Sequence, residues 1–306
     1  MGVLPGTGNR SWLFTPADDE RKISRAIGAG SDAVIFDLED AVTAEHRPKA
    51  RAILAELLAS RADGPSQRWV RINPLDTPDA LSDLAAAVQP HLDGIVLPKI
   101  RAAADVTRLD HALSALEVRD GIDRGTIAIM VVATETPEMV FRLGDLAGTS
   151  DRLVACTWGA EDLSTALGAT TNRRDDGEWD DPYRLARSLC LLAARAAGAQ
   201  PVDTLFAAFR DDDGLTRSTR VARLQGFTGK VAIHPCQVAI INEGFTPSSE
   251  ELSEAAAIVA AFADRAGAGA VSLDGRMLDR PHLLQAEQVL ASARRFGPDP
   301  GSSVET

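Results

Sequence analysis

Cysteine is scarce in this chain, which has only three among its 306 residues. Cys156, Cys190 and Cys236 are far apart in sequence and odd in number. They therefore provide neither a disulfide framework nor the closely spaced pairs of a zinc site. This cysteine usage is typical of a reducing compartment, and we expect a cytoplasmic protein.

Long apolar runs and an excess of basic residues are also missing. No window reaches the ~18 consecutive apolar residues of a membrane-spanning helix, and the Gly-rich residues 1–10 lack the apolar region of a signal peptide. The net charge is −12, which disfavours broad electrostatic binding to nucleic acid or an anionic membrane. An anionic small-molecule substrate would therefore need a local cation, either an Arg or Lys cluster or a metal ion.

Three common signatures of enzyme sites do not occur. The sequence has no G-x-G-x-x-G fingerprint and no Walker A motif. It also has no G-x-S-x-G nucleophile elbow. The sequence thus gives no indication of a dinucleotide-binding, P-loop or serine-hydrolase site.

A short apolar run that leads directly into carboxylates is the most informative stretch that is present. Val34-Ile35-Phe36 precede Asp37, Glu39 and Asp40. The run predicts a strand buried on both faces, as in a parallel sheet. Acids at the end of such a strand cost several kcal/mol to desolvate unless they meet cations or donors. Because sites form at the carboxyl ends of parallel strands, this stretch predicts one wall of a metal-dependent site.

The alternation of strand and helix patterns predicts the fold. Eight strand-like runs, mostly separated by helical patterns, fill about 230 residues and predict a TIM (β/α)8 barrel over residues 1–235, with a doubly wound open sheet as the alternative. After residue 235 only helical patterns are expected, with a Gly-rich break at 267–270. We interpret residues 236–306 as a helical lid or oligomerisation segment. The predicted strands are 11–15, 34–40, 68–73, 94–99, 126–132, 153–157, 202–206 and 230–234.

Two acids follow successive predicted strands. Glu135 comes after strand 126–132 and Asp162 after strand 153–157. Since neighbouring strands lie ~4.8 Å apart, both carboxylates can reach one ion, and Mg²⁺ is often held by one or two carboxylates with water and substrate. Each acid alone is equally typical of the first turn of a helix. Together they favour a Mg²⁺ site.

Three further residues have both a chemical and a structural interpretation. Arg71, inside a buried strand, calls for a carboxylate partner, which can be a substrate or the acids at 37–40. Lys99 can form a Schiff base, but we favour an ion pair with the same acids. His234, beside a proline at the end of the last strand, is more often structural than catalytic.

These stretches, in this order, resemble the citrate lyase β-subunit-like family, which includes malyl-CoA and citramalyl-CoA lyases. The resemblance covers residues 10–290, and it is the ordered set of motifs that makes it specific. The motifs are Ser11-Trp12-Leu13-Phe14-Thr15-Pro16, Asp37-Leu38-Glu39-Asp40-Ala41-Val42, Val70-Arg71-Ile72-Asn73, Leu97-Pro98-Lys99, Glu135-Thr136, Gly159-Ala160-Glu161-Asp162-Leu163, Gly229-Lys230, Ile233-His234-Pro235 and Met277-Leu278-Asp279.

The resemblance implies roles for particular residues. Glu135 and Asp162 would bind Mg²⁺, Arg71 would hold the substrate carboxylate, and Asp279 would act as an acid/base in the site of a neighbouring subunit of a trimer or hexamer. It also places Phe14, Thr15 and Pro16 at the substrate. Asp37, Glu39, Asp40 and Lys99 would hold the binding residues and metal-bound water in place. The chain departs from the family pattern at Thr134, where an aliphatic residue is usual, and at Arg101, near which the family often has an acid.

The expected activity is therefore Mg²⁺-dependent cleavage of a 3-hydroxyacyl-CoA, of the malyl-CoA or citramalyl-CoA type, into an acyl-CoA and a 2-oxo acid. Three alternatives stay open: a malyl-CoA-type thioesterase, a class II aldolase acting on free 2-oxo acids, and the β subunit of an acyl-carrier-dependent citrate lyase. The identity of the 2-oxo acid and the stereochemistry depend on loops such as 170–181.

Overall fold

A computed structural model of the chain describes residues 8–60, 64–265 and 269–296. The chain divides into two compact units, residues 1–242 and 243–306, and each is described by itself. The predictions for residues 1–7, 267–268 and 297–306 lie outside the described residues. Within the described part of the chain, no helix is both long and apolar enough to cross a membrane.

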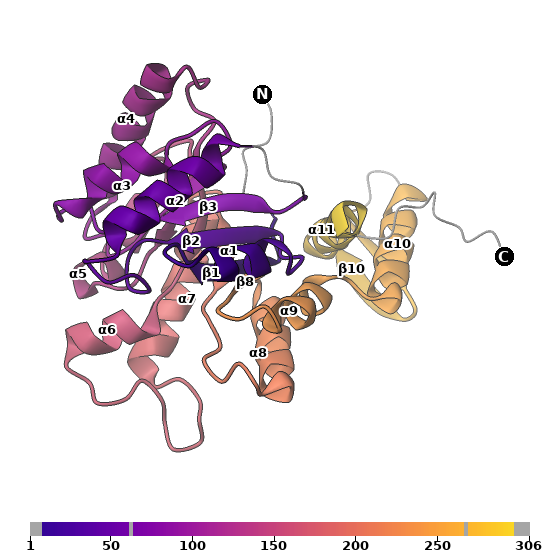
Figure 1. Ribbon diagram of the computed structural model, residues 1–306. Coiled ribbons are helices and arrows are strands. Elements are labelled where there is room, and N and C mark those ends of the chain that lie inside the picture. The colour runs from indigo at the N-terminus through magenta and orange to yellow at the C-terminus, as the bar shows by residue number, and fades with distance from the viewer. Residues whose placement is uncertain (1–7, 61–63, 266–268, 297–306) are drawn as a thin grey trace. The chain divides into compact units, whose positions relative to one another are not determined.

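The first unit is a closed barrel of eight parallel strands surrounded by helices (Figure 1). Each strand pairs with the next in sequence, and β8 pairs with β1 to close the barrel. The predicted TIM barrel is thus confirmed, and the open doubly wound sheet is wrong. The strands are β1 (Ser11–Pro16), β2 (Ala33–Asp37), β3 (Gln67–Arg71), β4 (Gly94–Leu97), β5 (Ala128–Val132), β6 (Leu153–Thr157), β7 (Gln200–Asp203) and β8 (Gly229–Ala232).

Two tryptophans fill the interior of the barrel. The rings of Trp12 and Trp69 are both fully buried and meet edge to face, with centroids 5.0 Å apart. Gly94 on β4 gives Trp69 its space, because a Cβ at residue 94 would lie 2.2 Å from the indole ring. A side chain larger than hydrogen at this position would displace the ring and disrupt the close packing of the core.

Several strands end two or three residues earlier than the apolar patterns predict. The expected strand 34–40 stops at Asp37, because both oxygens of this side chain accept backbone amides of the following loop, from Glu39 and Ala41, at 3.0 Å. These bonds turn the chain away from the sheet. Glu39 and Asp40 therefore lie in a loop beyond β2.

The helices alternate with the strands, and several begin at a capping residue or end at a glycine. Asp19 accepts two amide hydrogen bonds at the start of α1, and Gly121, at φ 69°, ends α4 in a left-handed conformation. The helices are α1 (Glu20–Ile27), α2 (Arg47–Ala59), α3 (Asp79–Ala87), α4 (Ala103–Asp120), α5 (Pro137–Val140), a 3₁₀ helix η1 (Leu143–Leu146), α6 (Ala160–Leu167), α7 (Asp181–Ala196), α8 (Asp212–Gln225) and α9 (Gln237–Phe245).

The second unit contains a β-hairpin that was not predicted from the sequence. Strands β9 (Ala270–Leu273) and β10 (Arg276–Asp279) pair antiparallel between α10 (Ser249–Ala263) and α11 (Arg280–Phe296). Their two-residue connection is Asp274-Gly275, with φ of 49° and 77°, which is the Asp-Gly signature of a tight hairpin. The expectation of helices alone after residue 235 is therefore wrong at 270–279. The role of this unit as a lid or oligomerisation segment stays a prediction.

Candidate active site

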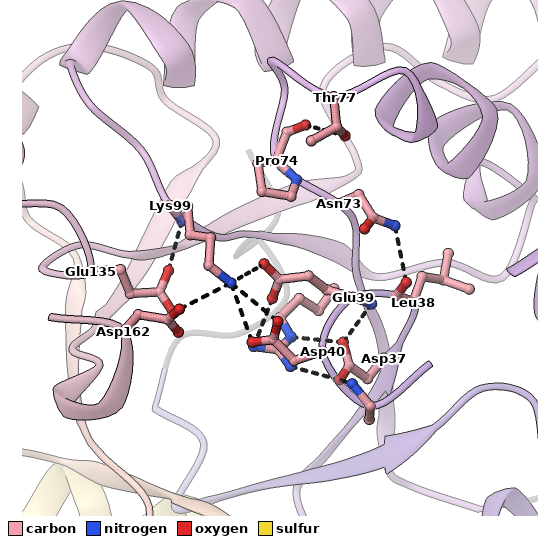
Figure 2. A network of polar contacts seen from close by, with 12 residues as sticks. Asp37, Leu38, Glu39, Asp40, Asn73, Pro74, Thr77, Lys99, Glu135 and Asp162 are labelled. Atoms are coloured by element: carbon pink, nitrogen blue, oxygen red, sulfur yellow. Dashed lines mark hydrogen bonds and ion pairs between the residues drawn. The ribbon is translucent and has the colours of Figure 1, made fainter. Parts of the chain in front are cut away.

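The carboxyl ends of five consecutive strands bring the predicted site residues together. Asp37 and Arg71 are the last residues of β2 and β3, and they face each other in register. Lys99 follows β4, Glu135 follows β5, and Asp162 lies in the first turn of α6 after β6. Figure 2 shows the carboxylates of Glu39, Asp40 and Asp162 gathered around the amino group of Lys99, and the carboxylate of Glu135 at its backbone amide.

Arg71 is held by the acids that end β2 and begin the next loop. Its Nε and Nη2 donate to Asp37 Oδ1 and Oδ2 at 2.7 and 2.6 Å, and its Nη1 lies 2.9 Å from Glu39 Oε2. The guanidinium carbon also lies 4.8 Å from the centroid of the Phe14 ring. Burial opposes the charge of Arg71, but the charge and hydrogen bonds of Asp37 outweigh burial and raise the pKa of Arg71. The predicted arginine–carboxylate pair is thus present in the structure.

Lys99 links three of the loops through a strained backbone. Its φ is 50°, in the left-handed region that non-glycine residues rarely adopt. In this conformation its amide N–H donates to Glu135 Oε2 at 2.6 Å, while Nζ lies 2.5 Å from Glu39 and 3.3 Å from Asp162. Burial alone would lower the pKa of Lys99, but the hydrogen bond to Glu39 and the surrounding carboxylates raise it. A lysine held protonated is a poor Schiff-base nucleophile, which favours the ion-pair interpretation.

Glu135 is almost completely buried, like Asp37 and Glu39 of the same cluster. Burial first, and then the negative charges of Asp162 and Glu39, raise the pKa of Glu135 well above its usual range. Its side chain lies against Gly159, where a Cβ would come within 2.9 Å of Glu135 Cγ and 3.2 Å of Oε1. The glycine between β6 and α6 is therefore what leaves space for this carboxylate.

The donor set fits Mg²⁺. Glu135 and Asp162 supply hard carboxylate oxygens from loops that follow neighbouring strands. The charged cluster holds the carboxylates of Asp37, Glu39, Asp40, Glu135 and Asp162 against only two cations, Arg71 and Lys99. Over residues 8–60, 64–265 and 269–296, no group of three or more His, Cys, Asp or Glu side chains is arranged to hold a metal. Two carboxylates with water and substrate oxygens are a usual ligand set for Mg²⁺.

The remaining predicted residues lie in three places. Thr15 is buried and Phe14 and Pro16 are half-buried at the end of β1, and their contact with substrate stays a prediction. Asp279 belongs to the second unit, where its Oδ1 lies 2.5 Å from His282 Nδ1, and its role in another subunit is also still a prediction. His234 is exposed and stacks on Phe209, with centroids 4.9 Å apart, and its structural role stays a prediction.

Three residues that support the site were not identified from the sequence as having this role. Thr134 is fully buried, and its hydroxyl accepts the Gly159 amide at 3.2 Å. Trp158 is buried, and its indole N–H donates to Asp203 at 2.8 Å. The only feature of the sequence that pointed to such a role was Thr134 itself, a polar residue where an aliphatic one is usual.

Comparison with known proteins gives consistent matches over nearly the whole chain. Residues 10–235 match the family HpcH/HpaI aldolase/citrate lyase. The chain is 35% identical to the citrate lyase subunit beta of Leuconostoc mesenteroides subsp. cremoris over 97% of both chains. It is 37% identical to a (3S)-malyl-CoA thioesterase of Cereibacter sphaeroides, over 93% of this chain and 94% of the relative. The crystal structure of CitE from Mycobacterium tuberculosis, in complex with magnesium, acetoacetate and coenzyme A, has a TM-score of 0.77 and 34% identity and covers 95% of this chain and 100% of that one.

Proposed function

This chain belongs to the HpcH/HpaI aldolase/citrate lyase family, and we propose that it is a Mg²⁺-dependent carbon–carbon lyase. Its substrate would be a 3-hydroxyacyl-CoA of the malyl-CoA or citramalyl-CoA type, and its products an acyl-CoA and a 2-oxo acid. Membership confirms the resemblance inferred from the sequence motifs. The substrate class is supported by the malyl-CoA thioesterase relative and by the CitE structure with magnesium, acetoacetate and coenzyme A.

One observation carries the proposal. Glu135 and Asp162 lie at adjacent strand ends, in the same charged cluster as the guanidinium of Arg71. Asp37 and Glu39 take three of the five N–H donors of Arg71, so a substrate carboxylate would bind the remaining N–H groups of Nη1 and Nη2. Two carboxylates can hold one divalent cation. Cleavage of a malyl-type thioester needs both the arginine and the cation, because its head group carries a carboxylate beside the reacting hydroxyl.

The residues of this chain would bind and orient the substrate. Glu135 and Asp162 would hold Mg²⁺, which supplies Lewis acidity and a template for the carboxylate and hydroxyl oxygens. Arg71, oriented by Asp37, would bind the substrate carboxylate, and Lys99 would keep Glu39, Asp40 and Asp162 in place. When a base removes the hydroxyl proton, the carbon–carbon bond breaks to give the 2-oxo acid and the enolate of the acyl-CoA, and that enolate takes up a proton at carbon.

Asp279 is our candidate for the residue that protonates the enolate. It is the last residue of β10 in the second unit, where its side chain is exposed and lies beside His282. We propose that it acts in the site of a neighbouring subunit, in a trimer or hexamer. A cytoplasmic location is proposed on the cysteine usage alone.

Thioester hydrolysis is the second candidate, favoured by the 37% identity to a (3S)-malyl-CoA thioesterase. In that case the carbon–carbon bond stays intact and CoA is released with malate. An aldolase acting on free 2-oxo acids, or a citrate lyase β subunit acting on an acyl carrier, would use neither CoA ester as its substrate.

Product analysis separates these functions. Purified protein is incubated with Mg²⁺ and malyl-CoA or citramalyl-CoA. Glyoxylate or pyruvate together with an acyl-CoA supports the lyase, whereas free CoA with intact malate or citramalate supports the thioesterase. No turnover of either ester contradicts both and favours the aldolase or the acyl-carrier subunit.

The metal pair is tested in the same assay. Asp162→Ala is expected to abolish Mg²⁺-dependent cleavage, while Glu138→Ala, which removes an exposed acid from the first turn of α5, should leave it near wild type. Full activity of the Asp162 variant would refute the assigned metal pair.

A further inference from the structure

We propose that Thr134 and Asp203 are positioning residues for the metal-binding pair, acting through the two-residue turn Trp158-Gly159. The proposal rests on the proposed function in one respect, that Glu135 and Asp162 bind Mg²⁺. The turn connects β6 to α6, so that Glu135 lies against one end of it and Asp162 lies three residues beyond it. Whatever fixes this turn also fixes the distance between the two carboxylates.

The first contact that holds the turn comes from the loop after β5, which ends at Val132. Thr134, adjacent to Glu135, is fully buried, and its Oγ1 accepts the Gly159 amide at 3.2 Å. The same hydroxyl lies 3.5 Å from the Gly159 carbonyl oxygen, to which it donates. One side chain therefore accepts the amide of the residue that contacts Glu135 and lies at the limit of hydrogen-bond distance from its carbonyl oxygen. An aliphatic side chain at position 134 could make neither bond.

The second contact that holds the turn comes from β7. The indole N–H of Trp158 donates to Asp203 Oδ1 at 2.8 Å, and both side chains are almost completely buried. Asp203 is the last residue of β7, so this bond joins the turn to the strand on its other side. Hydrogen bonds to a charged acceptor are shorter and stronger than neutral ones.

Asp203 is kept ionised by two cations. Lys230 Nζ donates to its Oδ2 at 2.9 Å, and Arg187 Nε donates to its Oδ1 at 2.8 Å. Burial alone would raise the pKa of Asp203, but the charges of Lys230 and Arg187 outweigh burial and lower it. The anchor for Trp158 is therefore a carboxylate across the physiological pH range.

The same indole also supports the loop that follows α6. Trp179 packs edge to face on Trp158, with centroids 5.0 Å apart, and the Arg173 guanidinium stacks on Trp179, 3.3 Å from the centroid of its ring. The loop 168–180 thus rests on the residue that precedes Gly159. A change at Trp158 is expected to disturb both the loop and the carboxylate pair.

The decisive test compares a variant that lacks the hydroxyl of Thr134 with a variant that keeps it. Thr134→Val keeps the shape of the side chain but cannot bond Gly159, whereas Thr134→Ser keeps the hydroxyl. Mg²⁺ affinity is measured by isothermal titration calorimetry on the full chain, which does not depend on turnover. We expect Thr134→Val to weaken Mg²⁺ binding by about 10- to 100-fold, the usual range for residues that orient metal ligands, and Thr134→Ser to stay within about threefold of wild type.

Thr219→Val is the matched control. Thr219 is fully buried on α8, and its hydroxyl has no hydrogen-bond partner among the described residues, so its loss should leave Mg²⁺ affinity unchanged. Trp158→Phe is a second, independent test variant, which removes only the indole N–H and part of the ring. It should weaken Mg²⁺ binding and raise the Mg²⁺ concentration for half-maximal activity more than it lowers kcat at saturating Mg²⁺.

The outcomes separate this proposal from the proposed function. If wild type binds Mg²⁺ and both Thr134→Val and Trp158→Phe bind it equally well, the positioning role is refuted while the metal site stands. Equal weakening by Thr134→Val and Thr134→Ser would also refute it, because the hydroxyl would not matter. Failure of wild type to bind Mg²⁺ would instead refute the metal pair itself.

Discussion

Arg71 and Asp37 form a fork-to-fork ion pair across the ends of β3 and β2, with Nε–Oδ1 and Nη2–Oδ2 distances of 2.7 and 2.6 Å. The two oxygens of Asp37 also accept the amides of Glu39 and Ala41. One carboxylate thus orients the arginine and shapes the loop that carries the other acids. The geometry depends on the planar guanidinium, which lysine does not reproduce.

Arg71→Lys is therefore expected to lower kcat/KM by about 10- to 150-fold, which corresponds to the loss of about 1.5–3 kcal/mol for a charge-assisted hydrogen bond. Steady-state cleavage of the active CoA ester measures the effect. Arg119→Lys is the control, because Arg119 forms an exposed pair with Asp120 and such pairs contribute little. A value of kcat/KM for Arg71→Lys within threefold of wild type would contradict the substrate-binding role of Arg71.

The barrel and the position of the site could be predicted because both follow from local patterns. Apolar runs such as Val34-Ile35-Phe36 fix buried strands, and the strand–helix alternation fixes the order in which they pair. Parallel strands bring their carboxyl ends to one face, so residues as distant as Asp37 and Glu135 could be placed together before any contact was known.

Features that depend on contacts across the sequence could not be predicted in the same way. The left-handed backbone of Lys99 and the Thr134–Gly159 bond arise from packing among neighbouring loops, and no periodicity encodes them. The hairpin at 270–279 is different. Its Asp274-Gly275 turn is a recognisable signal that was missed because the four-residue strands beside it are mostly exposed.

Substitution of Gly159 tests whether Glu135 needs the space that this glycine leaves. Gly159→Ala would place a Cβ 2.9 Å from Glu135 Cγ, so the carboxylate must move. We expect at least a tenfold loss of Mg²⁺ affinity, measured by calorimetry, with the fold retained by circular dichroism. Gly144→Ala is the matched control, since a Cβ there meets nothing within 4 Å. Unchanged Mg²⁺ affinity in Gly159→Ala would show that Glu135 does not need its present position to bind the metal.

The three cysteines are expected to differ strongly in reactivity. Burial raises the pKa of Cys156 to about 12 and the pKa of Cys190 well above its usual value, whereas Cys236 is exposed, with Sγ 2.9 Å from His234 Nδ1. The thiolate is the reactive form. A disulfide reagent such as DTNB should therefore titrate one thiol in the native protein and all three after unfolding. Cys236→Ser should abolish the native reaction, and rapid labelling of either remaining thiol in that variant would contradict the burial of Cys156 and Cys190.

Asp203 makes the stability of the barrel depend on pH. Its folded-state pKa is lowered by Lys230 and Arg187, so its ion pairs stabilise the protein above the unfolded-state pKa of about 3.9. This contribution is lost as the pH falls below that value towards the folded-state pKa, because the unfolded chain takes up the proton first. Asp203→Asn, which leaves Lys230 buried without its anion, is expected to cost about 3–5 kcal/mol in free energy of unfolding at pH 7.

The difference in free energy of unfolding between wild type and Asp203→Asn should then narrow below about pH 4, by up to ~1.4 kcal/mol per pH unit for a single proton. Urea unfolding at pH 7, 5 and 3.5 measures both proteins under the same conditions. Asp151→Asn, an exposed acid, serves as control and should differ from wild type by less than about 0.5 kcal/mol. A difference for Asp203→Asn that stays constant from pH 7 to 3.5 would mean that the substitution acts through packing and not through the charge that anchors Trp158.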